Sequence, residues 1–362
     1  MVQRSKAPSI TQVAELAGVS LQTVSNVLNF PDRVRPETQK KVLAAVKTLK
    51  YSPNAAARRL KTAQASSIAV RLDSNSITDG DGRGLYSGFI QDEFVYQLTV
   101  AAENRGIRVI TYTANNPEDE LKKINLLCNS QDIDGLILTS TQLNDPRIKL
   151  VNSKGVPFIT FGRPWGDDKM YSTQRPWIDV DGSFGTSLAT QKFWDSGYRN
   201  IGYAGWRFET HKKSDPQNVN EDRFQGWLDT ISKLDKSRKY TSGRNFSAKN
   251  DESVLGGRKM AAELLEKFPE IEVVVCASDT LALGVLLESG RLRKKPLIVS
   301  GFDNSPVSKE FNFSSLDQDL LEVAHSAIKI LMGESGNQIR HIDFTKESTK
   351  AHVLLRPILI SR

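Results

Sequence analysis

The chain has 362 residues, of which 39% are hydrophobic and 25% charged, a composition typical of a globular protein and not of a disordered or fibrous one. No apolar run reaches the ~18 residues of a membrane span, and the first residues carry no apolar signal segment. Two cysteines cannot build a disulfide framework. We therefore expect a cytoplasmic protein of two or three domains; a membrane protein, a secreted disulfide scaffold and a zinc-cysteine protein are excluded or disfavoured.

The positive charge is concentrated at one end of the chain. The formal net charge is +7, but residues 1–65 hold 11 Lys and Arg against three acidic residues, a net charge of +8. The remaining 297 residues carry a net charge of −1. An excess that covers a whole candidate domain is typical of a module that binds a polyanion. A solvated charged surface, the usual meaning of a lone charge run, fits this distribution less well.

Residues 1–52 are predicted to form three helices. Ser9 begins a capping box that opens the first helix, and Gly18 ends it in a turn that needs a positive φ. Ser20 caps a second helix, and Pro36 opens a third. A helix, a glycine turn and a second helix within about twenty residues are the pattern of a helix-turn-helix headpiece.

A polar and alanine-rich segment, residues 53–66, follows as the predicted hinge helix and linker. Its helix-favouring part is about eight residues long, too short to be stable alone in water. We therefore expect a helix that forms only under some conditions, which suits a switch.

The headpiece contains four short motifs, which are Ile10–Ser20 (ITQVAELAGVS), Thr23–Ser25 (TVS), Val27–Asn29 (VLN) and Tyr51 followed by Pro53–Arg58 (PNAAAR). In these motifs the headpiece sequence resembles that of the lactose/galactose repressor (LacI/GalR) family. The resemblance runs through residues 9–61 almost without gaps, and the rest of the chain matches more loosely along its whole length. It implies a transcriptional regulator that binds double-stranded DNA.

The same resemblance implies which residues contact the DNA. The second helix would lie in the major groove and the hinge helix in the minor groove. The implied base contacts are Leu21, Gln22, Asn26, Ala57 and Leu60, and the implied backbone contacts are Ser20, Thr23, Ser25, Tyr51 and Asn54. Gln and Asn each bond adenine in bidentate fashion, and an apolar wedge such as Leu60 bends the duplex. The family most often has Arg at the Asn26 position, and Arg prefers guanine, so the half-site is expected to differ from the common one.

Residues 67–362 alternate short apolar strands with amphipathic helices. The expected strands are Ile68–Leu72, Arg108–Thr113, Asp134–Ser140, Val156–Phe161, Trp177–Asp181, Ile201–Ala204, Val273–Ala277 and Ile298–Phe302. The expected helices lie near 90–105, 117–129, 182–197, 220–233, 250–267, 280–289 and 317–332. This alternation predicts an α/β domain of two lobes, each a doubly wound parallel sheet, with a ligand crevice at the carboxyl ends of the strands. The resemblance implies the same two-lobed, periplasmic-binding-protein-like domain, with three crossovers between the lobes.

Polar residues that follow the expected strands are the candidates for this crevice. Arg223, at the opening of a helix, matches the ligand-binding arginine of the family. Guanidinium and carboxylate groups bind pairs of sugar hydroxyls, and aromatic rings cover the apolar face of a sugar. The effector-binding candidates are Phe89, Arg163, Trp206, Arg223, Phe246, Ser278 and Asp303. The three aromatic residues fit an ordinary core equally well, whereas Phe224 and Trp227 are assigned to the core. Gly162 and Ser278 stand where the family usually has Asn or an acidic group, so the ligand's identity stays open.

Other motifs carry no chemistry of their own. The loop 73–88 is long and is either a lid or an inert insertion. Its glycine-rich part lacks the residues of a phosphate loop, and the four histidines are scattered. Cys128 and Cys276 are predicted to be structural. We therefore predict no catalytic residue, no metal and no cofactor.

The preferred interpretation is a repressor of carbohydrate-utilisation genes that a sugar-type effector releases from a near-palindromic operator. One alternative is a regulator whose corepressor, a purine-like or other small metabolite, strengthens DNA binding. Another is a sugar-binding or enzymatic α/β protein with an incidental basic tail. The tail Ala351–Arg362 lacks the heptad helix that family tetramers use, which favours a homodimer.

Overall fold

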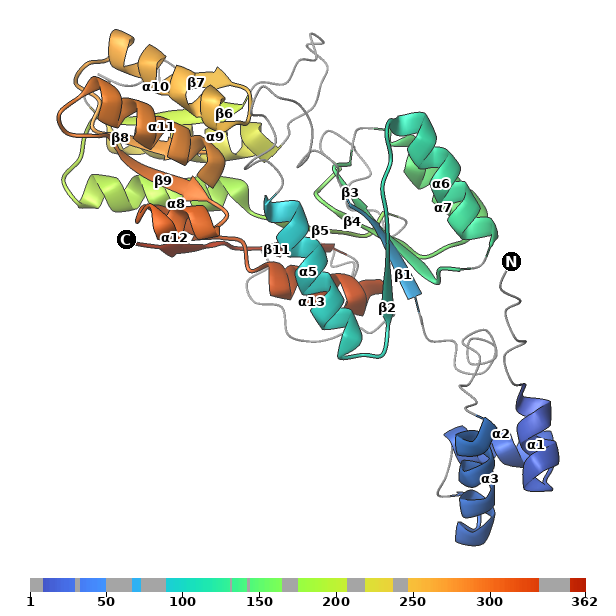
Figure 1. Cartoon of the computed structure of the whole chain (residues 1–362). Coiled ribbons are helices and arrows are strands. Elements are labelled where there is room, and N and C mark those ends of the chain that lie inside the picture. Colours follow the sequence, from blue (N-terminus) through green and yellow to red (C-terminus); the bar gives the residue numbers. More distant parts are fainter. Residues whose placement is uncertain are drawn as a thin grey trace. The chain divides into compact units, whose positions relative to one another are not determined.

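The computed structural model describes residues 9–29, 33–49, 67–72, 89–130, 132–141, 144–164, 175–206, 219–236, 247–331 and 352–362. The chain divides into two compact units, Met1–Gln64 and Ala65–Arg362 (Figure 1). The expected hinge helix of residues 53–66 and the loop 73–88 lie outside the described residues.

The described part of the first unit consists of helices α1 (Ile10–Ala17), α2 (Leu21–Asn29) and α3 (Pro36–Leu49). The predicted capping box is present, since the backbone N–H of Gln12 donates to Ser9 Oγ at 3.3 Å and that of Ser9 donates to Gln12 Oε1 at 2.8 Å. Gly18 ends α1 with φ 64°, the left-handed conformation that the turn was predicted to need. The three helices enclose a small apolar core, made of Val13, Ala14, Val24, Val27, Val42 and Ala45. The predicted helix-turn-helix is confirmed.

The second unit contains two six-stranded sheets within the described residues, and we call the body around each sheet a lobe. The sheet of lobe 1 is parallel throughout, in the order β11-β5-β4-β3-β1-β2. Its strands are β1 (Ser67–Arg71), β2 (Arg108–Tyr112), β3 (Gly135–Thr139), β4 (Phe158–Phe161), β5 (Trp177–Val180) and β11 (His352–Leu355). Its helices are α5 (Phe89–Glu103), α6 (Pro117–Asn129), α7 (Pro146–Lys154) and α13 (Leu320–Leu331).

The sheet of lobe 2 has the order β12-β10-β9-β8-β6-β7, and only the pairing of β12 with β10 is antiparallel within the described residues. Its strands are β6 (Ile201–Trp206), β7 (Ser247–Asn250), β8 (Val273–Cys276), β9 (Ile298–Phe302), β10 (Ser314–Asp317) and β12 (Ile358–Ile360). Its helices are α8 (Gly182–Asp195), α9 (Val219–Leu234), α10 (Val254–Lys267), α11 (Asp279–Leu292) and α12 (Pro306–Glu310).

The prediction of eight strands was wrong in number, because the described residues form twelve. The four missed strands are β7, β10, β11 and β12, and helices α7 and α12 were also missed. The helix expected from residue 250 begins at Val254 instead. Ser253 caps it by accepting the backbone N–H of Gly256, and the residues up to Asn250 belong to β7.

In the described part of the chain, the backbone passes between the lobes at three places, as the family resemblance implied. These are the β5–α8 step at Asp181, the β10–α13 step at Gln318 and the β11–β12 step at Arg356 (Figure 1). The first and third steps are joined, since the backbone N–H of Asp181 donates to the carbonyl of Leu355 at 2.7 Å. The lobes therefore meet at a bundle of crossing strands.

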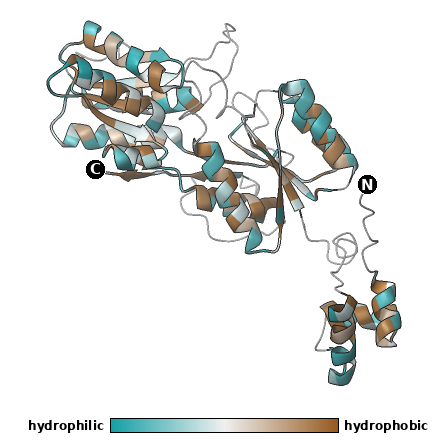
Figure 2. Cartoon of the chain, viewed as in Figure 1, coloured by the Kyte–Doolittle hydropathy of each residue, from teal (hydrophilic) through white to brown (hydrophobic). Residues whose placement is uncertain are grey.

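The interior of each lobe is apolar, and Figure 2 shows hydrophobic strands beneath helices with hydrophilic outer faces. Phe224 and Trp227 are buried together with Tyr203, which confirms their assignment to the core. Cys276 is fully buried and Cys128 half-buried, and both are free thiols. Among the described residues, none of the helices has the length and apolarity needed to cross a bilayer.

Helices α8 and α9 pack so closely that Gly226 has no room for a side chain. A Cβ atom there would lie 2.1 Å from the carbonyl oxygen of Ser183 and 2.5 Å from Thr186 Oγ1. Gly226→Ala is therefore expected to lower the free energy of unfolding by about 1–3 kcal/mol, measured by urea denaturation. Gly290→Ala in α11 is the matched control, because its Cβ would meet only Pro296, at 3.5 Å. Equal stability of the two variants would contradict the close packing.

Candidate functional site

Helix α2 presents polar side chains on the face opposite its core. Val24 and Val27 are buried, whereas Gln22 and Leu21 are exposed, the latter to 48%. Gln22 Nε2 donates to Asn26 Oδ1 at 3.0 Å, so the two amides lie side by side on one face. Amide side chains of this kind can form bidentate hydrogen bonds with adenine in the major groove.

The N-terminus of α2 carries a second group of predicted DNA contacts. Ser20 Oγ accepts the backbone N–H of Thr23 at 3.1 Å and lies 2.9 Å from Thr23 Oγ1. Hydroxyl groups at a helix N-terminus are well placed for phosphate, because the helix dipole favours negative charge there. Ser25 is half-buried on the same helix. The predicted contacts Tyr51, Asn54, Ala57 and Leu60 lie outside the described residues.

Arg223 is the centre of the predicted effector site. It lies in the second turn of α9 and not at its opening, because the helix already begins at Val219. Its Nη1 donates to the carbonyl of Ala277 at 2.5 Å, and its guanidinium lies 3.7 Å from the ring centre of Phe302 and 5.7 Å from that of Trp206. The side chain is 6% exposed, and its Nε has no hydrogen-bond partner among the described residues. Arg223 thus keeps one buried donor that lacks an acceptor.

Asp303 faces Arg223 from the end of β9. It has a φ of 145°, a backbone conformation that favours glycine and marks local strain. Gln318 Nε2 donates to its Oδ1 at 2.7 Å, and the backbone N–H of Asp279 donates to its Oδ2 at 3.4 Å. Burial, together with the charges of Asp279 and Glu252, raises the pKa of Asp303 well above its usual value, whereas Arg223 and the Gln318 hydrogen bond lower it.

Glu252 joins this cluster, although the sequence did not mark it. It follows the missed strand β7, its side chain is exposed, and the Ser278 hydroxyl donates to its carboxylate. Ser278 in turn accepts the backbone N–H of Leu281 at 3.3 Å and so caps α11. Desolvation raises the pKa of the Glu252 carboxyl, whereas the charge of Arg223 and the hydrogen bond from Ser278 lower it. Recognising β7 as a strand would have placed Glu252 at its carboxyl end. We call Arg223, Glu252, Ser278 and Asp303 the Arg223 cluster.

Arg163 follows β4 as predicted, but carboxylates already engage its guanidinium. Nε donates to Asp179 Oδ2 at 2.6 Å and Nη2 donates to Asp222 Oδ2 at 3.0 Å. The residue is 9% exposed. Of the predicted aromatic residues, Trp206 ends β6 and is half-buried, whereas the side chain of Phe89 and all of Phe246 lie outside the described residues.

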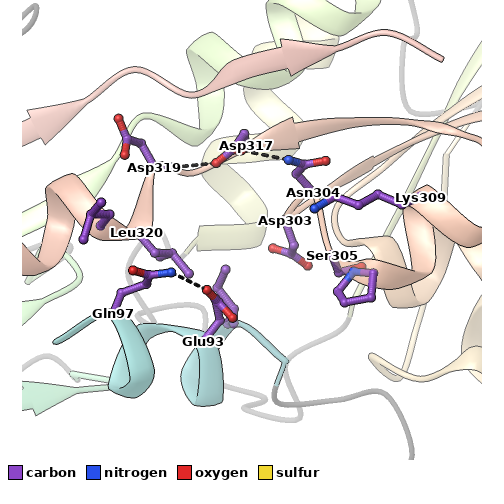
Figure 3. A pocket seen from close by; sticks show the side chains of 12 residues that line it. Glu93, Gln97, Asp303, Asn304, Ser305, Lys309, Asp317, Asp319 and Leu320 are labelled. Atoms are coloured by element: carbon purple, nitrogen blue, oxygen red, sulfur yellow. Dashed lines mark hydrogen bonds between the residues drawn. The ribbon is translucent and has the colours of Figure 1, made fainter. Parts of the chain in front are cut away.

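A pocket of about 360 Å³ opens beside Asp303, between α5 of lobe 1 and the β9–α12 loop of lobe 2 (Figure 3). Its volume falls within the range of small-molecule sites, roughly 300–1,000 Å³. Its charged lining residues are four acidic residues and one lysine. The lining residues are Ile90, Glu93, Gln97, Asp303, Asn304, Ser305, Pro306, Lys309, Asp317, Asp319, Leu320 and Leu321. Asp303 is therefore shared by the pocket and the Arg223 cluster.

Over the described ranges, no three His, Cys, Asp or Glu side chains are grouped so that they could hold a metal ion. His352 is buried, and its Nε2 lies 3.2 Å from the carbonyl oxygen of Arg175, so this ring nitrogen has a hydrogen-bond partner within the core.

A helix-turn-helix headpiece and a two-lobed α/β unit with a polar interlobe pocket define the class of ligand-responsive DNA-binding regulators. Residues 9–54 match the model of the bacterial regulatory proteins of the lacI family. Residues 88–358 match the model of periplasmic binding proteins and the sugar-binding domain of the LacI family. The chain therefore belongs to the LacI family of bacterial transcriptional regulators, which confirms the resemblance seen in the sequence.

Relatives with similar sequences and structures cover nearly the whole chain. The transcriptional regulator CelR of Thermobifida fusca is 29% identical over 94% of this chain and 96% of its own. The catabolite control protein A of Staphylococcus epidermidis is 26% identical over 89% of this chain and 91% of its own. The complex of CelR with cellobiose superimposes with a TM-score of 0.63 at 24% identity, covering 98% of this chain and 99% of the other. The lac repressor dimer bound to its operator gives a TM-score of 0.69 at 21% identity, covering 99% and 98%.

Proposed function

We propose that the protein is a homodimeric repressor of carbohydrate-utilisation genes, released from its operator by an uncharged sugar. The observation that carries this proposal is the buried Nε of Arg223, which finds no acceptor among the described residues, in a cluster with the carboxylates of Asp303 and Glu252. A sugar hydroxyl accepts a hydrogen bond from the guanidinium and donates one to a carboxylate at the same time. Neighbouring hydroxyls of one sugar ring therefore satisfy both kinds of group in the Arg223 cluster.

The relatives support a carbohydrate ligand and a dimer on DNA. CelR has been solved in complex with cellobiose, and the lac repressor as a dimer on its operator. Other relatives of this chain are named MalR and AglR. In this proposal the protein works in the cytoplasm by binding alone, without catalysis, metal or cofactor.

In the proposed mechanism, each protomer reads one half-site of a near-palindromic operator through α2. The sugar binds more tightly to the conformation of the lobes in which the headpieces bind the operator weakly. It therefore shifts the population toward that conformation, and operator DNA weakens sugar binding by the same factor.

The experiment is a titration of operator binding by the full chain, followed by fluorescence anisotropy, against cellobiose, maltose, lactose and their monosaccharides. At least one sugar is expected to weaken operator binding by about 5–150-fold, the usual range of allosteric coupling. A purine or other metabolite that strengthens binding would instead establish the corepressor alternative. If no operator is found, and deletion of residues 1–61 leaves the activity of the protein intact, the third alternative, an α/β protein with an incidental tail, is favoured.

The charge of the Arg223 cluster predicts rejection of acidic sugars. Two carboxylates face one guanidinium, and a ligand carboxylate accepts hydrogen bonds but donates none to Asp303 or Glu252. We expect the thermal shift with a neutral disaccharide to disappear with its aldonic acid, for example cellobiose against cellobionate or maltose against maltobionate. Glu252→Gln is expected to reduce the ratio of the Kd for the acid to the Kd for the neutral sugar by about tenfold, the effect of one charge-assisted hydrogen bond.

The control for this prediction is Asp251→Asn, which removes the same charge from the neighbouring exposed position. It should leave the ratio of the two Kd values unchanged. If both variants change the ratio equally, the selection against acids arises from the overall field of the protein and not from Glu252.

A further inference from the structure

An ion pair joins the two lobes beside the Arg223 cluster. Arg163 belongs to lobe 1, two residues after the end of β4, and Asp222 belongs to lobe 2, in α9. Nη2 of Arg163 lies 3.0 Å from Oδ2 of Asp222, and their side chains are only 10% and 15% exposed. Water therefore screens this pair much less than a surface pair.

Arg163 is fixed to lobe 1 by a second carboxylate. Asp179 of β5 accepts both Nε of Arg163, at 2.6 Å, and its backbone N–H, at 3.2 Å. The other oxygen of Asp179 accepts the backbone N–H of Val180 at 2.8 Å. These contacts with the sheet of lobe 1 fix the orientation of the guanidinium toward Asp222.

Asp222 is fixed equally well to lobe 2. Its Oδ2 also accepts the backbone N–H of Ser183 at 3.0 Å, at the first turn of α8. Gly182 makes room for this contact, since a Cβ there would lie 2.9 Å from Asp222 Oδ2 and 2.8 Å from Arg223 Cγ. Asp222 and the effector-binding candidate Arg223 therefore rest side by side on the same crossover between the lobes.

Asp222 lies among other carboxylates at the first crossover. Burial raises the pKa of its carboxyl, Arg163 lowers it, and Asp179 and Asp181 raise it further. If Arg163 were removed, the carboxylates of Asp179, Asp181 and Asp222 would lie close together without its positive charge. The lobes would also lose an ionic contact that joins them.

We propose that Arg163 and Asp222 are positioning residues, whose ion pair holds the two lobes at the angle that this structure shows. Because Asp222 adjoins Arg223 in α9, any movement of α9 on ligand binding acts on this pair at once. Only this last step rests on the proposed function; the role of the pair in the ligand-free protein does not.

The test measures the distance between the lobes without any ligand. Spin labels are attached to the full chain through Lys122→Cys in α6 and Lys259→Cys in α10, both at exposed positions. Half-buried Cys128 is replaced by Ser, and Cys276 is fully buried and stays unlabelled. Labelled protein is diluted with unlabelled protein, so that double electron–electron resonance reports distances within one chain.

Asp222→Asn is expected to add a second distance population, about a tenth of the molecules or more, to the single population of the parent protein. Asp229→Asn, which removes the same charge from an exposed position on the same helix, should leave the distribution unchanged. Arg163→Lys keeps the positive charge but loses the planar guanidinium, so its distance distribution should lie between those of the parent and of Asp222→Asn. This variant also tests the proposal if Asp222→Asn fails to fold. A distribution for folded Asp222→Asn or for Arg163→Lys that equals that of the parent would overturn the proposal. A failed search for a sugar would contradict the proposed function and leave this result standing.

Discussion

Arg223→Gln is expected to weaken binding of the effector sugar by about 100-fold, because two charge-assisted hydrogen bonds at roughly 1.5–3 kcal/mol each are lost or weakened. Gln retains a donor but not the positive charge that balances Asp303 and Glu252. The variant should also leave the repressor on its operator at sugar concentrations that release the parent protein. Isothermal titration calorimetry gives the first result, and operator anisotropy in the presence of sugar gives the second.

Arg291→Gln is the matched control for this prediction. Arg291 lies on α11 and pairs with Glu288 at 2.5 Å, with 62% of its side chain exposed. Its replacement should leave sugar affinity unaffected. If Arg223→Gln lowers sugar affinity no more than Arg291→Gln does, the effector does not bind at the Arg223 cluster.

Asn26→Arg is expected to change the preferred base at one position of each operator half-site from adenine to guanine. A bidentate contact discriminates between bases by about 1–3 kcal/mol, which is roughly 5–150-fold for each half-site. Selection from a library randomised at the half-sites, followed by anisotropy at fixed salt concentration, measures the change. The salt must be held constant because the added charge strengthens binding to every sequence.

Thr11→Arg separates the two effects of this substitution. It adds the same charge at an exposed position of α1, outside the helix that is proposed to read the bases. We expect it to raise affinity for all DNA sequences alike and to leave the preferred half-site unchanged. A variant Asn26→Arg that still selects the parent half-site would show that this residue does not read a base.

The headpiece was predictable because its signals are local in sequence. The Ser9–Gln12 capping box, the glycine at position 18 and the Ser20 cap each act over three or four residues, and the structure contains all of them. The eight strands that were predicted could be found for a similar reason, since each contains a short apolar run. Strands β7 (SAKN) and β10 (SSLD) were missed because neither shows such a run. Their place is set by pairing with neighbouring strands, which no local pattern records.

The candidate site was predictable in its members but not in their contacts. Arg223, Ser278 and Asp303 were named from their positions after strands or in a helix, and the structure brings them together. The partners of Arg163 lie 16 and 59 residues away in sequence, so its role in joining the lobes appears only in the fold. Glu252 was missed for a different reason: the helix was expected to start at residue 250, which placed this carboxylate on its first turn.

The final segment, residues 352–362, provides the outer strand of one sheet as β11 and then the outer strand of the other as β12 (Figure 1). A ribosome makes these residues after all the other strands. Neither sheet can therefore be complete on a nascent chain that stops short of residue 352. Both sheets therefore depend on the same short segment, and a chain truncated before residue 352 contains neither lobe in its complete form.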